Sequence, residues 1–245
     1  MIFWITSEIN RLKLEYHLVI SRDWNSHRVD LLTAFVGSCL RLYNQSLHFE
    51  FELPVSDRRP GDDAALLAVM GLIRLFKAGR REALLQSIIV LEHMLLQSKH
   101  NYDALLILAR LYMFLGAGSL ALDRYNRLSI KNIQYATISW VLYTRLSSIH
   151  PYPASYPTSG KGRTTIAPVD DMSQALDWHK SAEALSRKSV HSMQEGGRWD
   201  FALDSLETNH AVFNGFARCL LYAELKRIDR FSSTSKMAIK QRMRK

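Results

Sequence analysis

The spacing of apolar, small and glycine residues in residues 101–128 constrains the fold most. Apolar residues recur at helical spacing on both sides of Gly116, a residue with the backbone freedom to end a helix. Ala109 and Ala121 lie one on each side of this glycine, and such small residues let two helix axes approach closely. The segment therefore predicts a pair of short helices, which cannot bury its own apolar face and needs neighbours to stack on.

The same segment resembles the tetratricopeptide repeat, a helix pair of about 34 residues. Two positions differ from that pattern, because Leu105 replaces the usual Trp and Ile133 stands where Pro often closes the repeat. With Tyr102 as the first position, the matching positions are Leu108, Ala109, Tyr112, Gly116, Ala121 and Tyr125. We therefore expect one good, slightly degenerate repeat over residues 101–135.

Further copies of the pattern lie on both sides of this repeat. Residues 197–206 repeat the Gly-x4-Ala-Leu-Asp spacing of residues 116–123, at a distance of 81 residues. This distance is not a multiple of 34, so irregular structure is expected between the copies. A weaker pair is expected upstream, with a first helix that ends near Gly79 and a second that carries Ala83. The predicted fold is all-α, a tetratricopeptide-like helix-pair superhelix, or α-solenoid.

Residues 1–149 are expected to form a helical region with degenerate repeats. Apolar residues at helical spacing predict helices over residues 3–20 and 26–47. Between them and the first repeat, residues 48–63 alternate apolar and charged side chains before two prolines. Because a strand there has no visible partner, an extended arm is preferred over a strand. Asn101 and Asn132 are expected to cap or separate helices.

The second part of the chain is expected to differ in character. Residues 150–169 contain four of the six prolines among Ser, Thr and Gly, which predicts a flexible surface loop. Further helix pairs are expected over residues 170–230, beginning with a long helix over residues 172–194. Residues 231–245 are expected to form a basic tail, and a Ser-rich stretch predicts disorder there.

The net charge of +9 comes almost entirely from the C-terminus. Residues 226–245 hold eight basic residues and one acidic residue, so the rest of the chain is nearly neutral. Cys39 and Cys219 lie in apolar helical patterns without a Cys-x-x-Cys spacing, which favours buried, reduced thiols and a cytoplasmic location. The start of the chain lacks the basic segment of a signal peptide, and no apolar run reaches the ~20 residues that span a bilayer, so no membrane contact is expected.

Motifs for catalysis, metals and cofactors are not found in the sequence. His93 and His100 are seven residues apart, but a predicted turn separates them, so a zinc site is not expected. Lys161 between two glycines resembles part of a phosphate loop without that loop's first glycine or its magnesium-binding Ser or Thr. No Gly-x-Ser-x-Gly elbow is present. No catalytic, cofactor-binding or metal-binding residue is therefore predicted.

Acetyl-CoA enzymes of the common acetyltransferase fold hold the cofactor with a Gln/Arg-x-x-Gly-x-Gly/Ala turn. In the two nearest segments, Trp199 follows Gln194-x-x-Gly197 and Asp63 follows Arg58-x-x-Gly61 at the position that requires Gly or Ala. We therefore do not expect this chain to bind acetyl-CoA as such an enzyme does.

Several stretches, covering about four fifths of the chain together with their surroundings, resemble one protein family. The most specific is Ile130-Lys-Asn-Ile-Gln134, because a general tetratricopeptide pattern does not require it. The others are Glu8–Glu15, Leu91–Ser98, Asn101–Leu106, Arg110–Ala117 and Asp170–Trp178. These stretches resemble the non-catalytic (auxiliary) subunit of the N-terminal acetyltransferase B (NatB) complex. Members of that family are several times longer, so the sequence resembles an internal fragment of such a chain.

The resemblance implies a helical-repeat scaffold without cofactors that holds a catalytic NatB subunit and aids co-translational acetylation at the ribosome. It does not assign individual partner-binding residues. An unrelated tetratricopeptide-type adaptor that binds a peptide or helix of a partner protein stays open as the alternative. The basic tail allows ribosome contact without recognition of a specific nucleic-acid sequence, and a solvated end is its other interpretation.

Overall fold

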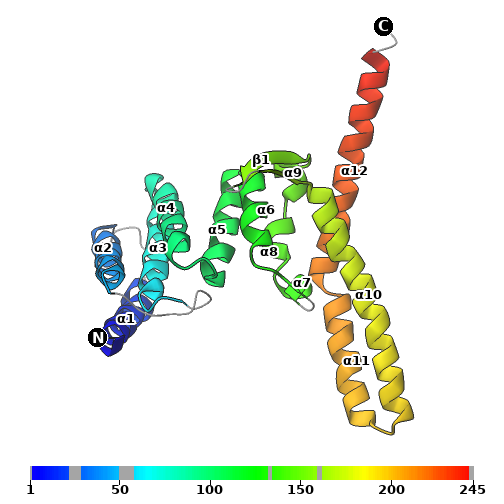
Figure 1. Cartoon of the computed structure of the whole chain (residues 1–245), viewed down its shortest axis with the longest axis horizontal. Helices are drawn as coiled ribbons and strands as arrows, with labels where there is room; N and C mark the ends of the chain where they lie inside the picture. The colour runs from blue at the N-terminus through cyan, green and yellow to red at the C-terminus, as the bar shows by residue number, and fades with distance from the viewer. Residues whose placement is uncertain (1, 22–28, 50–57, 132–133, 159–161, 243–245) are drawn as a thin grey trace. The chain divides into compact units, whose positions relative to one another are not determined.

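The structure is a computed structural model that describes residues 2–21, 29–49, 58–131, 134–158 and 162–242 (Figure 1). Side chains are described for all of these except residues 154–158, 162–166 and 232–242. The chain divides into two compact units, residues 1–111 and residues 112–245. Each unit has its own set of buried apolar side chains.

The first unit is built from helices that pack in chain order. Helix α2 packs on α3, and α3 packs on α4 (Figure 1). A π-helical segment, η1, continues α1. The elements are α1 (Ile2–Glu15), η1 (Tyr16–Ile20), α2 (Val29–Leu47), α3 (Asp62–Lys77), α4 (Glu82–Gln97) and most of α5 (Tyr102–Leu115).

A buried polar contact joins the N-terminal ends of α3 and α5. The side-chain oxygen of Asn101 accepts a hydrogen bond from the N–H of Ala104 at 3.2 Å, which confirms the predicted helix cap. The Asn101 amide also donates to the carboxylate of Asp62 at 3.0 Å, and the N–H of Arg59 donates to the same oxygen at 3.2 Å. Burial raises the pKa of Asp62. These donors are what allow a carboxylate to lie in the core of this unit.

The second unit combines short helices, a β-hairpin and three longer helices. Helices α10 and α11 form an antiparallel hairpin, and α12 packs against α10 and the short helices (Figure 1). The buried Glu224 of α12 accepts a hydrogen bond from the N–H of Ser147 in α9 at 2.8 Å. The elements are α6 (Gly118–Asn126), α7 (Gln134–Thr137), α8 (Trp140–Tyr143), α9 (Leu146–Ile149), β1 (Ala154–Thr158), β2 (Gly162–Ile166), α10 (Pro168–Glu195), α11 (Trp199–Phe213) and α12 (Phe216–Arg242).

Three helix-to-helix turns share one geometry. Gly79, Gly116 and Gly197 follow α3, α5 and α10, with φ of +99°, +80° and +68°. In each turn the residue after the glycine donates its N–H to the carbonyl five residues back, at 3.0, 2.9 and 2.9 Å respectively. This is the Schellman arrangement, in which glycine takes the left-handed conformation that other residues adopt at a cost. The three predicted helix pairs are therefore confirmed at their turns.

The predicted fold class is confirmed, because the described chain is dominated by helices that follow one another in pairs. The predicted helices over residues 3–20, 26–47 and 172–194 are observed as α1 with η1, α2 and α10. The small residues expected at helix crossings, Ala109 and Ala121, are both fully buried. Asn132, Ile133 and most of the predicted arm over residues 48–63 lie outside the described residues.

Two expectations for the second unit are wrong in part. Within the predicted loop of residues 150–169, β1 and β2 pair antiparallel, with Ala154 opposite Ile166 and Thr158 opposite Gly162. The β-branched run Thr164-Thr165-Ile166 favours an extended strand over an irregular loop. The predicted disordered tail is wrong for residues 231–242, because α12 continues through them to Arg242. No Gly or Pro interrupts this stretch, and Lys, Met, Ala, Gln and Arg are good helix formers.

Candidate interaction surfaces

The structure brings together the two stretches that carry the most specific family resemblance. Lys131 donates its backbone N–H to the side-chain oxygen of Gln134 at 2.9 Å, just before α7. Tyr135, the next residue, stacks on Trp178 of α10 with ring centroids 5.3 Å apart and planes 27° apart. Residues from near position 131 and near position 178 therefore form one local cluster, although 43 positions separate the two stacked rings.

This cluster borders a cavity of about 290 Å³, which we call the tyrosine pocket. Tyr125 and Tyr143 are buried and meet edge to face, with centroids 5.7 Å apart. Burial raises the pKa of both phenols. The side chains that line the pocket belong to Tyr125, Asn126, Ser129, Ile130, Tyr135, Tyr143, Asp171 and Gln174.

Asp171 supplies the carboxylate of the tyrosine pocket. The amide of Asn126 in α6 donates to it at 3.4 Å, which links α6 to the start of α10. Burial raises the pKa of Asp171, and the negative charge of neighbouring Asp170 raises it further, whereas the Asn126 hydrogen bond lowers it. The pocket thus holds a half-buried carboxylate among aromatic rings.

A second region lies where α10, α11 and α12 meet. Arg218 of α12 donates to Glu183 of α10 at 2.8 Å and to the carbonyl of Phe213 at the end of α11 at 3.3 Å. Arg187 donates to the other oxygen of Glu183 at 2.7 Å. The hydrogen bond from Arg218 is the largest influence on the pKa of Glu183. Together with the bond from Arg187 it holds this pKa below its usual range. One arginine therefore fixes the three helices to one another.

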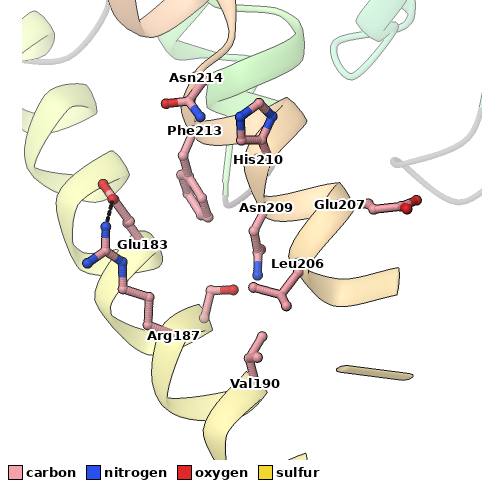
Figure 2. Close-up of a pocket in the computed structure, with 10 residues that line it drawn as sticks. Glu183, Arg187, Val190, Leu206, Glu207, Asn209, His210, Phe213 and Asn214 are labelled. Atoms are coloured by element: carbon pink, nitrogen blue, oxygen red, sulfur yellow. Dashed lines mark hydrogen bonds and ion pairs between the residues drawn. The ribbon is translucent and has the colours of Figure 1, made fainter. Parts of the chain in front are cut away.

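Two cavities, of about 460 and 710 Å³, adjoin this contact and share Glu183, Phe213 and Asn214. Figure 2 shows the smaller one, with Phe213 and Leu206 pointing from α11 toward α10 and Glu207 turned away from it. We call the two cavities together the α10–α12 groove. Because two arginines already bind its central carboxylate, the groove is suited to apolar side chains rather than to acid–base chemistry.

Helix α11 exposes a row of large apolar side chains. Trp199, Leu203 and Leu206 are 58%, 59% and 46% exposed, and their i, i+4, i+7 spacing places them along one side of the helix. We call these three residues the α11 stripe. Phe201 is also exposed but lies on the other side, since two helical residues differ by about 200° in direction. The residues that flank the stripe include the acidic Asp200, Asp204 and Glu207.

The two cysteines differ in burial, and His93 and His100 lie in α4 and in the turn that follows it. Cys39 is buried, and burial raises its thiol pKa to about 12. The expectation of a buried Cys219 is wrong, because this side chain lies off the packed side of α12 and lines the α10–α12 groove. The ring of His93 lies 3.5 Å from the hydroxyl of Tyr43, and His100 is exposed in the turn after α4.

No cluster of three or more potential metal ligands occurs among the described residues. Lys161 of the phosphate-loop-like segment lies outside them. None of the described helices has both the length and the hydropathy that crossing a bilayer requires.

Comparison with known proteins identifies the family. A family described as "N-acetyltransferase B complex (NatB) non catalytic subunit" matches residues 4–243. This chain belongs to that NatB family. The match covers both units, the tyrosine pocket and the α11 stripe. The resemblance predicted from residues 130–134 and 170–178 is thereby confirmed.

Curated relatives agree with the NatB family assignment. A subunit of the N-terminal acetyltransferase B complex from Schizosaccharomyces pombe is 30% identical over 57% of this chain and 18% of its own length. The NatB auxiliary subunit N-alpha-acetyltransferase 25 of Rattus norvegicus is 33% identical over 60% of this chain and 14% of its own length. The human protein of that name is 32% identical over 46% of this chain and 12% of its own length. The matched region is thus less than a fifth of each relative, and the family is one of non-catalytic subunits.

The tyrosine pocket and the α11 stripe are not among the features predicted from the sequence. The stripe could have been found, because Trp199, Leu203 and Leu206 have helical spacing. The pocket could not, since it joins α6, α7, α8 and α10 around residues that are up to 49 positions apart. The family stretches at residues 130–134 and 170–178 lie beside or within the pocket, but their sequence does not indicate which side chains line it.

Proposed function

We propose that this chain is part of a non-catalytic scaffold that holds the catalytic subunit of NatB. The match to the NatB non-catalytic subunit family over residues 4–243 carries this proposal. It also favours the scaffold over an unrelated tetratricopeptide adaptor, which would not need the family stretches around residues 131 and 178. A role beside nascent chains would place the protein in the cytoplasm.

The α11 stripe and the adjoining α10–α12 groove are the proposed contact surface for that catalytic subunit. Rows of exposed aromatic and aliphatic side chains with a polar rim are typical of protein interfaces. Tryptophan is among the residues that contribute most to such interfaces, and Trp199 lies at the start of the row. The acidic residues beside the stripe favour a partner surface that is apolar with basic edges.

Co-expression with a NatB catalytic subunit followed by gel filtration tests the scaffold role. We expect the two chains to elute as one complex. Separate elution at micromolar concentrations would contradict the proposal for this chain.

Substitutions in α11 then test the location of the contact. Trp199→Ala should weaken the complex about 30-fold, since truncation of an aromatic residue that dominates an interface typically costs ~2 kcal/mol. Phe201→Ala is the matched control, because it removes an equally exposed ring from the other side of the same helix, and it should change the affinity less than about threefold. Titration of labelled catalytic subunit measures both affinities. Equal losses would place the contact elsewhere while leaving the scaffold role intact.

We further propose that the basic end of α12 contacts ribosomal RNA. Residues 226–245 carry a net charge of +7, and the helix continues through most of them. Phe231 is their single aromatic residue, so phosphate attraction rather than base stacking would dominate. Binding should therefore be independent of sequence and should weaken steeply with salt.

Deletion of residues 232–245 tests this contact by sedimentation with ribosomes. The deletion removes five basic residues and should reduce the bound fraction at least tenfold in ~50 mM salt. Replacement of the same five residues by glutamine removes the same charge but keeps the length of the chain. It therefore separates the effect of charge from the effect of chain length. Unchanged sedimentation of both variants would rule out the tail as the ribosome contact.

A further inference from the structure

The carboxylate of Asp171 differs in its partners from the part-buried carboxylate of Asp123. Asp123 of α6 forms ion pairs with Arg124 and with Arg127, the latter at 3.0 Å. Among the described residues, no ion pair is formed by Asp171, whose hydrogen-bond donor is the neutral amide of Asn126 at 3.4 Å. Removing a carboxylate from water without a counter-charge is unfavourable. The tyrosine pocket therefore contains an anionic group that an incoming cation would stabilise.

The walls of the pocket suit a cation that carries an alkyl chain. Tyr125, Tyr135 and Tyr143 line the pocket, and the negative faces of tyrosine rings attract ammonium groups. Tyr125 and Tyr143 are buried, so little water competes at the inner end. The stack of Tyr135 on Trp178 holds the outer ring in place. Aromatic rings around one carboxylate form an environment that recognises organic ammonium ions.

The volume of the pocket and the number of its oxygen ligands favour an organic ammonium ion over a metal ion. One carboxylate and two amides provide too few charged oxygens for a resident divalent metal ion, which takes six or more oxygen ligands. The volume of about 290 Å³ lies at the lower limit of the ~300–1,000 Å³ that is usual for small-molecule sites. A lysine ammonium has three N–H donors at the end of a slim chain, and Asp171, Asn126 and Gln174 offer acceptors for them.

We propose that the tyrosine pocket binds the ammonium group of a lysine side chain presented by a protein partner. The site is separate from the α11 stripe, so the proposal does not depend on where the catalytic NatB subunit binds. Asp171 provides the charge, the tyrosine rings exclude water and attract the ammonium, and Asn126 orients the carboxylate.

The test uses the full 245-residue chain and small probes that carry the lysine chemistry. The probes are n-butylammonium, the uncharged n-butanol and N-acetyl-lysine methylamide, and tyrosine ring resonances in NMR titrations report the affinity. We expect n-butylammonium to bind at least tenfold more tightly than n-butanol, and the lysine derivative to bind no more weakly than n-butylammonium. Equal affinity for the alcohol would overturn the cation site. Loss of the lysine derivative with retention of the amine would overturn the choice of a protein lysine.

Two isosteric variants locate the charge. Asp171→Asn should weaken n-butylammonium binding at least tenfold, whereas Asp170→Asn should change it less than twofold. Asp170 is the matched control because it is an exposed carboxylate in the same first turn of α10 that does not line the pocket. Equal weakening by both variants would overturn the proposal. Circular dichroism shows whether Asp171→Asn folds. If it does not, the affinities of the unchanged chain for n-butylammonium and n-butanol still test the proposal.

Discussion

Helices α6 and α11 share a Gly-x4-Ala-Leu-Asp pattern, but burial extends further around α6 than around α11. Each follows a glycine turn of the same geometry, and each continues with Ala-Leu-Asp at the same distance from the glycine. The alanines behave alike, since Ala121 is fully buried and Ala202 is 1% exposed. The leucines that follow them do not, because Leu122 is fully buried whereas Leu203 is 59% exposed. The shared motif determines the turn and the first helix contact but not the second contact.

The neighbours of the two helices account for this difference. α6 packs against α8 and β2, and its Leu122 is fully buried. The packing of α11 is chiefly with α10, and this packing leaves Trp199, Leu203 and Leu206 of the α11 stripe 58%, 59% and 46% exposed. A helix pair of this kind needs a further layer on its open side. In α6 the chain supplies that layer, and at α11 we propose that a partner does.

Matched truncations of the two leucines should give the largest effect. Leu122→Ala should lower the free energy of unfolding by about 3 kcal/mol, because it removes a buried side chain and leaves a cavity. Leu203→Ala should change it by less than about 0.5 kcal/mol, since that side chain is already in water. Urea unfolding followed by circular dichroism measures both values. A loss above about 1.5 kcal/mol for Leu203→Ala would mean that α11 is covered within the chain, and would remove the basis for its role as an interface.

Substitution of the turn glycines should instead give equal effects. Gly116→Ala and Gly197→Ala should each cost about 1 kcal/mol, because both residues have positive φ and an added Cβ would meet no atom within 4 Å. The cost is therefore conformational and the same in both hairpins. Urea midpoints with unchanged slopes measure it. Costs that differ by more than about 1 kcal/mol would show that the two turns are not equivalent, contrary to their hydrogen bonds.

Features that depend on neighbouring residues could be predicted from the sequence, whereas features that depend on packing with distant elements could not. The turns at Gly79, Gly116 and Gly197 were predictable because a glycine and its flanking helices lie within about ten residues. The cap at Asn101 was predictable for the same local reason, although its contact with Asp62 was not. The exposure of Leu203 depends on which distant elements pack nearby, which the local pattern does not contain.

Two further outcomes depended on competing local preferences. The stretch after Ser232 has the composition of a polar tail, but it also lacks helix breakers, and it continues α12 to Arg242. Prolines and glycines predicted a loop over residues 150–169, whereas its β-branched residues form a strand in the structure. The tyrosine pocket required tertiary structure, because Asn126 and Asp171 are 45 positions apart and their residue types are common on protein surfaces.

The smallest predicted effect concerns the hydrogen bond between Asn126 of α6 and Asp171 of α10. The pKa of Asp171 is raised by burial and by Asp170, so the folded chain retains this proton at a higher pH than the unfolded chain. The contribution of Asp171 to stability is therefore fully present below its unfolded pKa of ~3.9 and is lost as the pH rises through the folded value. Asp171→Asn removes this loss, so its stability relative to the unchanged chain should rise from pH 4 to pH 7, by less than about 1 kcal/mol because the residue is only half-buried. Urea unfolding at both pH values measures the difference, with Asp170→Asn as the control for one negative charge at the same helix end. A relative stability of Asp171→Asn that falls with pH would show that the carboxylate is stabilised by a cation already within the chain, and the tyrosine pocket would then have no charge to offer a lysine.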